Sequence, residues 1–142
     1  MKKGAFMKYI ALIISIITCL SMANLTAKIT VFNYSPYPIA VKVWFDGGTE
    51  DFPKGIINKV DKKPFETAKG IAPTKSETRT KDAAQIKRKW SAWAKIEGQW
   101  TPIKEIEQKK WVRGGAFVKA WVMMAVEPET GTNIFDIVVG GN

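Results

Sequence analysis

The longest nearly unbroken apolar run outside the N-terminus spans residues 116–126 and reads AFVKAWVMMAV. It follows Gly114 and Gly115, ends before Glu127-Pro128, and contains one charged residue, Lys119. Its valines and aromatic residues favour a strand over a helix. An apolar run bounded by Gly and Pro is typical of a strand that is covered on both faces. We therefore expect residues 116–126 to form the central strand of an all-β domain.

Shorter segments with alternating polarity predict further strands at residues 28–33, 39–45 and 133–139. In such a strand, every second side chain faces the core. The first core-facing sets are Ile29 and Val31, then Ile39, Val41, Val43 and Phe45. Turn-forming residues separate the segments at intervals typical of a sandwich. The sequence predicts a single β-sandwich of about seven mostly antiparallel strands, Ig-like or jelly-roll-like.

Three prolines, Pro53, Pro64 and Pro73, interrupt residues 46–82. A structureless loop of this length is unusual in a compact domain. We therefore expect one or two short strands here, at residues 55–60 and as a polar edge strand around residues 77–80. Residues 99–102 read as a break.

Two structures remain open for residues 83–97. Ala, Gln, Lys and Glu favour a helix capped by Asp82 and ended by Gly98. The surrounding strands favour a strand, which we prefer. That strand would place Trp90, Ala92 and Ala94 on one face and Lys87, Lys89, Trp93 and Lys95 on the other.

The first 23 residues resemble a secretory signal peptide, which would form a helix ahead of a single domain at residues 24–142. Lys2, Lys3 and Lys8 precede the apolar stretch 9–20, and Ser21-Met22-Ala23 offers a cleavage site. We expect export to the periplasm or the medium, with cleavage after Ala23 or, alternatively, after Ala27. An uncleaved anchor is the other possibility. Cleavage after Ala23 removes three lysines, which lowers the formal charge from +9 to +6, together with Cys19, the only cysteine.

The stretch 29–37, ITVFNYSPY, resembles the first strand and turn of several secreted β-sandwich families, thaumatin-like proteins among them. The cysteines that define thaumatin-like domains are missing here. The resemblance supports the fold class, and no residue role is carried over from it.

Residue types that are absent exclude several chemistries. The chain has no histidine and, after cleavage, no cysteine, so Ser-His or Cys-His catalysis and Cys/His zinc sites are excluded. No phosphate-binding glycine motif is present, and we predict no metal, no cofactor and no enzymatic activity. Asp46, Glu50 and Asp51 do not have the spacing of a known calcium loop. Glu105 and Glu107 would share a strand face, which leaves a carboxylate-based glycan hydrolase as an alternative.

Tryptophans among lysines form the most informative pattern in the chain. The candidate ligand or membrane surface comprises Lys87, Lys89, Trp93, Lys95, Lys109, Lys110 and Trp111. Exposed indole rings beside ammonium groups suit anionic lipid or an acidic glycan. Nucleic acid is not expected as a partner of an exported protein. The alternative is that the tryptophans belong to the core and that the lysines keep the surface soluble.

These features predict an exported, non-enzymatic β-sandwich that serves as a binding or structural module of the cell envelope or extracellular space. Its partner would be a protein or an acidic glycan. The alternative is a membrane-active protein that engages anionic lipid through the Trp/Lys cluster.

Overall fold

The computed structural model describes residues 26–45, 48–82, 85–108, 112–113 and 117–141. These residues form nine strands. They are β1 (Thr26–Tyr34), β2 (Ile39–Phe45), β3 (Gly48–Phe52), β4 (Ser76–Asp82), β5 (Gln85–Ile96), β6 (Gln99–Glu107), β7 (Val112–Arg113), β8 (Phe117–Val126) and β9 (Asn133–Gly141). Within these ranges there is no helix that is long and apolar enough to cross a membrane. The predicted signal peptide lies outside the described residues.

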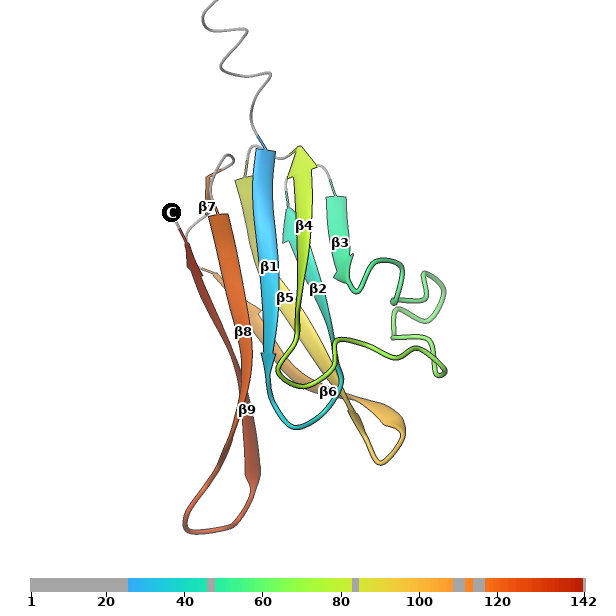
Figure 1. The fold of residues 1–142 in the computed structure, drawn as a ribbon, viewed down its shortest axis with the longest axis vertical. Coiled ribbons are helices and arrows are strands. Elements are labelled where there is room, and N and C mark those ends of the chain that lie inside the picture. Colours follow the sequence, from blue (N-terminus) through green and yellow to red (C-terminus); the bar gives the residue numbers. More distant parts are fainter. Residues whose placement is uncertain (1–25, 46–47, 83–84, 109–111, 114–116, 142) are drawn as a thin grey trace, which may run out of the picture.

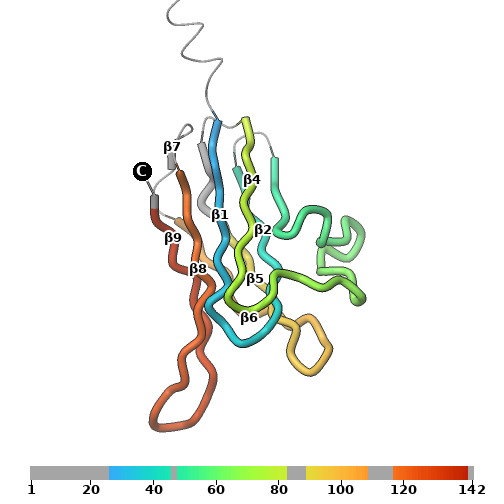
Figure 2. The backbone as a smooth tube through the Cα atoms, in the orientation of Figure 1, coloured from blue at the N-terminus to red at the C-terminus, as the bar shows by residue number. Residues whose placement is uncertain are grey.

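Two sheets pack face to face as a sandwich (Figure 1, Figure 2). Sheet A has the order β4-β1-β8-β9, and sheet B has the order β3-β2-β5-β6, with β7 pairing with β5 as well. All neighbouring strands are antiparallel except β1 and β8, which are parallel. The predicted fold class, a single and mostly antiparallel β-sandwich, is therefore confirmed, with nine strands in place of about seven.

The core lies between the two sheets and follows the predicted alternation. Its largest fully buried side chains include Trp90, Phe52, Ile29, Ile39, Val31, Val41, Val43, Val118 and Val122. They come from strands of both sheets, so each sheet buries one apolar face against the other.

One face of the apolar run at residues 117–126 is open to solvent. Val118, Ala120 and Val122 of β8 are buried, but Phe117 and Met123 on the opposite face are exposed. The prediction of a strand covered on both faces is therefore wrong. The run is apolar on both sides because β8 also contributes apolar side chains to the solvent-facing side of sheet A. The predicted interior position is confirmed, since β8 lies between β1 and β9.

Within the ambiguous segment at residues 83–97, Gln85–Ile96 form strand β5, which confirms the preferred structure. Its pairing with β2 and β6 outweighs the helix propensity of its residues. The predicted break at residues 99–102 is wrong, because β6 already begins at Gln99. Pro102 is tolerated because it lies on an outer strand, beside a register shift between Ala92 and Trp93.

Between β2 and β4, the sequence prediction was partly wrong. β3 was missed, and the strand expected at residues 55–60 is reduced to a single bridge between Ile57 and Pro64 inside a loop. The polar edge strand around residues 77–80 is confirmed as β4.

Charged side chains bridge the sheet edges. Glu50 on β3 is buried, and its carboxylate lies 2.8 Å from Lys81 Nζ and 3.7 Å from Arg79 Nε on β4. On the other side of the sandwich, β6 and β9 approach each other, and Lys104 Nζ lies 3.9 Å from the Asp136 carboxylate.

Candidate functional site

The sequence-predicted Trp/Lys cluster is only partly within the described residues. Lys89, Trp93 and Lys95 lie along β5, on the outer face of sheet B. Lys87 is also on β5, but its side chain lies outside the described part of the chain. Lys109, Lys110 and Trp111 lie outside the described residues altogether.

Lys89 is engaged within the protein. Its Nζ lies 3.1 Å from Glu105 Oε1 and 4.9 Å from the centroid of the Trp44 ring. Ser91 Oγ donates a hydrogen bond to Glu105 Oε2 at 3.2 Å. This charge is therefore already compensated, although the side chain remains partly accessible.

The other two residues of the cluster hold a loop in place. Lys95 Nζ donates to the carbonyl oxygen of Ala68 at 3.0 Å and lies 5.7 Å from the Trp100 ring centroid. Trp93 is half-buried and packs against a small cluster that contains Ile56 and Ile57. Of the three predicted surface residues whose side chains are described, Trp93 and Lys95 thus contact residues 53–75.

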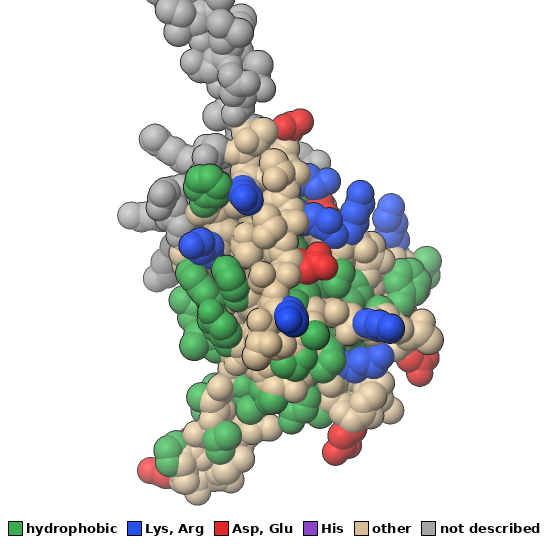
Figure 3. Space-filling view, viewed as in Figure 1, with side chains coloured by type: hydrophobic (Ala, Val, Ile, Leu, Met, Phe, Trp, Pro, Cys, Tyr) green, Lys and Arg blue, Asp and Glu red, His purple; other side chains and the backbone are tan. Residues whose placement is uncertain are grey.

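Residues 53–75, here named the lysine loop, are rich in lysine. The loop holds six lysines against two carboxylates, Asp61 and Glu66, for a formal charge of +4. All six ammonium-bearing side chains are exposed. They are Lys54, Lys59, Lys62, Lys63, Lys69 and Lys75. None of them takes part in an ion pair within the described residues, and Lys and Arg side chains gather on this side of the molecule in Figure 3.

A hydrogen-bonded turn forms the tip of the lysine loop. Asn58 N donates to Lys63 O, and Lys62 N donates to Asn58 O, each at 2.8 Å. The Asn58 side chain accepts a hydrogen bond from Val60 N at 2.9 Å. Because the turn is closed in this way, Val60 is held at the tip with its side chain 90% exposed.

The base of the lysine loop is fixed to strands β2 and β6 of sheet B. Trp100 Nε1 donates to Phe65 O at 3.0 Å, and Ile39 and Ile71 exchange backbone hydrogen bonds at 2.8 and 3.0 Å. Gly70 lies under the Trp100 ring, where an added Cβ would be 2.6 Å from Trp100 Cη2. The loop is therefore a defined surface in spite of its length.

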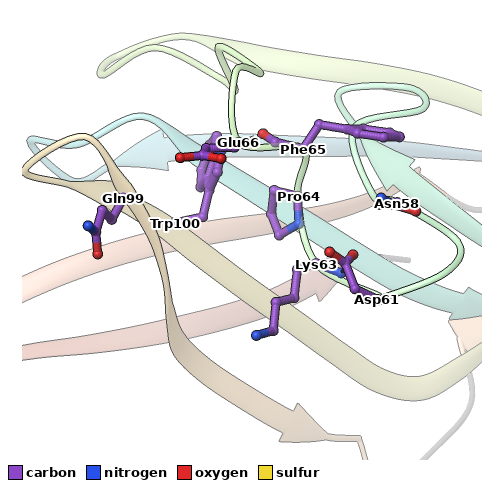
Figure 4. A pocket seen from close by; sticks show the side chains of 8 residues that line it. All are labelled: Asn58, Asp61, Lys63, Pro64, Phe65, Glu66, Gln99 and Trp100. Carbon is purple, nitrogen blue, oxygen red and sulfur yellow. Dashed lines mark hydrogen bonds between the residues drawn. The ribbon is translucent and has the colours of Figure 1, made fainter.

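Two grooves lie where the lysine loop meets the β5–β6 hairpin. The first has a volume of about 440 Å³ and is lined by Asn58, Asp61, Lys63, Pro64, Phe65, Glu66, Gln99 and Trp100 (Figure 4). The second, of about 510 Å³, shares Asp61 and Lys63 with the first and reaches Trp93 and Glu105. Ammonium and carboxylate groups mix in both grooves, so neither groove is strongly positive. Lys62 and Lys63 line the second groove, and Lys54, Lys59, Lys69 and Lys75 do not line either one.

Asp51, on the outer face of sheet B, has a shifted pKa. Burial raises the pKa of its carboxyl above the ordinary value of 3.8, against the opposing effects of a hydrogen bond from the Ile57 amide and of the nearby Lys42. Asp51 is therefore a group whose charge works against folding at neutral pH.

Glu105 and Glu107, the carboxylates considered in the sequence analysis, are both exposed on β6. Glu105 is 57% exposed and bound to Lys89 and Ser91, while Glu107 is exposed at the end of β6. Within the described ranges, no three acidic, histidine or cysteine side chains gather in a way that could hold a metal ion.

Comparison with protein-family models, with curated proteins and with solved structures found no match. The residues of the molecule itself must therefore carry the functional argument.

The lysine loop was not predicted as a functional surface from the sequence, because its prolines were interpreted only as signals of strand boundaries. The available signal was the count of six lysines within residues 53–75, with Val60 between Lys59 and Lys62. The sequence does not show that these lysines are exposed, that they take no part in the ion pairs of the described residues, or that Val60 beside them is exposed as well.

Proposed function

We propose that this chain is an exported, non-enzymatic β-sandwich binding module that attaches to an anionic lipid surface through the lysine loop. The observation that carries the proposal is the combination at the loop tip: Lys59, Lys62 and Lys63, exposed and outside the ion pairs of the described residues, lie within three positions of the exposed Val60, against one exposed carboxylate, Asp61. Lysines near an anionic membrane each contribute about 1 kcal/mol of attraction.

Lipid suits this surface better than a soluble polyanion because the tip is also apolar. Val60 and Phe65 are both exposed, at 90% and 47%. Exposed apolar side chains among cations gain free energy when they enter the boundary between headgroups and acyl chains. The formal charge of +6 expected for the cleaved protein acts in the same direction at longer range.

The test is vesicle co-sedimentation with purified protein whose N-terminus has been established by mass spectrometry. We expect binding to vesicles containing phosphatidylglycerol, little binding to pure phosphatidylcholine, and weakening by salt. Replacing Lys59 and Lys62 together by Gln should lower the partition constant about tenfold to thirtyfold. The matched control replaces Lys28 and Lys119, which lie on the outer face of sheet A, together by Gln. This control should lower the partition constant less.

A second comparison separates lipid from an acidic glycan. Val60→Ser should weaken vesicle binding but leave binding to soluble dextran sulfate unchanged, and Val126→Ser on β8 is its control. Absence of binding to anionic vesicles at low salt would refute the proposal. So would equal losses from the lysine pair on the loop and the pair on sheet A.

A further inference from the structure

The outer face of sheet A is a second surface, on the opposite side of the sandwich from the outer face of sheet B. Its outward-facing apolar side chains come from three adjacent strands, and we name them the aromatic face. They are Phe32, Tyr34, Phe117, Trp121, Met123, Ile134 and Val138. Five of them, Tyr34, Phe117, Met123, Ile134 and Val138, are between 42% and 58% exposed. Figure 3 shows hydrophobic side chains gathered over β8 and β9.

The aromatic face is ordered by its own contacts. The rings of Phe32 and Trp121 are stacked, with centroids 5.8 Å apart and planes at 12°, and Tyr34 stacks on Phe32 at 6.2 Å. Trp121 leans over Gly140, where an added Cβ would be 3.4 Å from Trp121 Cζ3. Because Gly140 has no side chain, the Trp121 ring can pack directly over the backbone of Gly140.

Polar residues border the aromatic face along β4. The outward positions of this strand are Ser76, Thr78, Thr80 and Asp82, all exposed. An apolar centre with a polar rim is the usual anatomy of a protein–protein interface. A contiguous exposed apolar patch on a soluble domain marks an interaction site.

Lys119 and Asp136 lie on opposite sides of the centre of the aromatic face, at equal distances in the sheet register. Lys28 is a further cation on the Lys119 side, and Asp136 also lies 3.9 Å from Lys104 Nζ of the same chain. In the sheet register, Trp121 pairs with Val138 in the central row. Two residues to one side, Lys119 pairs with Gly140, and two residues to the other side, Met123 pairs with Asp136. The face is therefore positive on one side of the Trp121–Val138 row and negative on the other.

We propose that this surface binds a second copy of the same chain, face to face, about a two-fold axis that runs along the Trp121–Val138 row. Such an axis reverses the strand direction of the partner, so that the Lys119 row of each copy lies over the Asp136 row of the other. Sheets in sandwiches pack with their strands nearly aligned, which this arrangement allows. The same patch then meets itself, as an isologous interface requires.

Self-association of this kind is independent of the lipid proposal. It uses sheet A, whereas the lysine loop packs on the outer face of sheet B through Trp93 and Ala40. A dimer formed in this way leaves both loops outside the interface.

The first experiment is sedimentation equilibrium of the purified protein over about two decades of micromolar concentration. We expect a monomer–dimer equilibrium. Val138→Lys puts a like charge at the centre of the interface in both copies and should raise the dimer dissociation constant at least about tenfold. Val60→Lys makes the same chemical change on the lysine loop and should leave the dimer unchanged. Circular dichroism would verify that each variant is folded.

A charge-swap pair tests the register itself. Lys119→Asp alone and Asp136→Lys alone should each weaken the dimer, because like charges then face each other twice. An equimolar mixture of the two variants should associate, since every facing pair in the mixed dimer has opposite charges. A monomeric wild-type protein, or a mixture that fails to associate while the wild type does, would overturn the proposal. A monomer whose binding to anionic vesicles is abolished by Val138→Lys would assign the face to lipid and would also overturn it.

Discussion

Asn33 on β1 holds Ile71, the residue that closes the lysine loop onto β2, with Asn33 Nδ2 donating to Ile71 O at 2.9 Å. The same Nδ2 donates to Tyr37 O at 2.7 Å, and Oδ1 accepts hydrogen bonds from the backbone and the hydroxyl of Ser35 at 2.9 and 2.7 Å. Asn33 is fully buried, so one amide group satisfies the polar groups of both the β1–β2 turn and the end of the loop.

Asn33→Ala should therefore destabilise the fold by about 2–4 kcal/mol, because it removes four hydrogen bonds at a buried position and leaves the Ser35 amide without its acceptor. Urea unfolding followed by tryptophan fluorescence would measure the change. Asn58→Ala is the matched control. Its side chain accepts one exposed hydrogen bond, so we expect a loss below about 1 kcal/mol. Equal losses at the two positions would contradict the role given to Asn33.

Gly70→Ala should cost about 3 kcal/mol, because a left-handed backbone and a steric clash act together. Gly70 has φ +72°, and an added Cβ would lie 2.6 Å from Trp100 Cη2 and 2.7 Å from Ile39 O. Gly55 has the same φ but no atom within 4 Å of an added Cβ. Gly55→Ala should therefore cost only about 1–2 kcal/mol, and the difference in unfolding free energy between the two variants isolates the clash.

Glu50→Gln should destabilise the protein by about 1–3 kcal/mol, because it removes the charge that compensates Lys81 and Arg79. Arg79 Nε is buried and, among the described residues, has no hydrogen-bond partner, so the Glu50 carboxylate 3.7 Å away is important to it. In contrast, Glu105→Gln breaks an exposed pair with Lys89 and should cost less than about 1 kcal/mol. Thermal unfolding of both variants at one ionic strength would decide; a larger loss from Glu105→Gln would refute this account.

Asp51→Asn should stabilise the protein at pH 7. Because burial raises the folded-state pKa above 3.8, the folded protein binds this proton more tightly than the unfolded chain. The resulting penalty is complete above the folded-state pKa and disappears as the pH falls through that pKa toward 3.8. The amide oxygen of Asn can still accept from the Ile57 amide.

The measurement is the difference in unfolding free energy between Asp51→Asn and the wild type, from pH 7 down to about pH 3.5. We expect the advantage of the variant to shrink as the pH falls. Asp82→Asn, at an exposed site on β4, is the control. An advantage that grows toward acid pH would show that the sign of the shift is wrong.

Much of the fold was predictable because a half-buried strand shows a two-residue alternation of apolar and polar side chains in its sequence. Ile29 and Val31, and the alternation from Ile39 to Phe45, placed β1 and β2 with the correct faces inward. Errors arose where local signals were misleading. Pro102 suggested a break because the sequence does not show that its strand, β6, is an edge strand of sheet B.

The candidate site was harder to predict, since proximity between side chains is not periodic. Trp90 and Trp93 are neighbours in sequence, but one is in the core and the other lies under the lysine loop. Lys89 and Lys95 were predicted as part of a ligand or membrane surface, and the fold gives them Glu105, Trp44, Ala68 and Trp100 as partners.

Residue identities and short spacings were enough to give the alternating apolar pattern that makes a β-sandwich, and to exclude chemistry that needs histidine or more than one cysteine. Both depend on residue identity and on spacing of a few positions. Only the tertiary structure decided which cations remain exposed without ion pairs and which face of β8 stays open. Those properties depend on strands far apart in sequence, such as β1 beside β8, whose pairing no local pattern records.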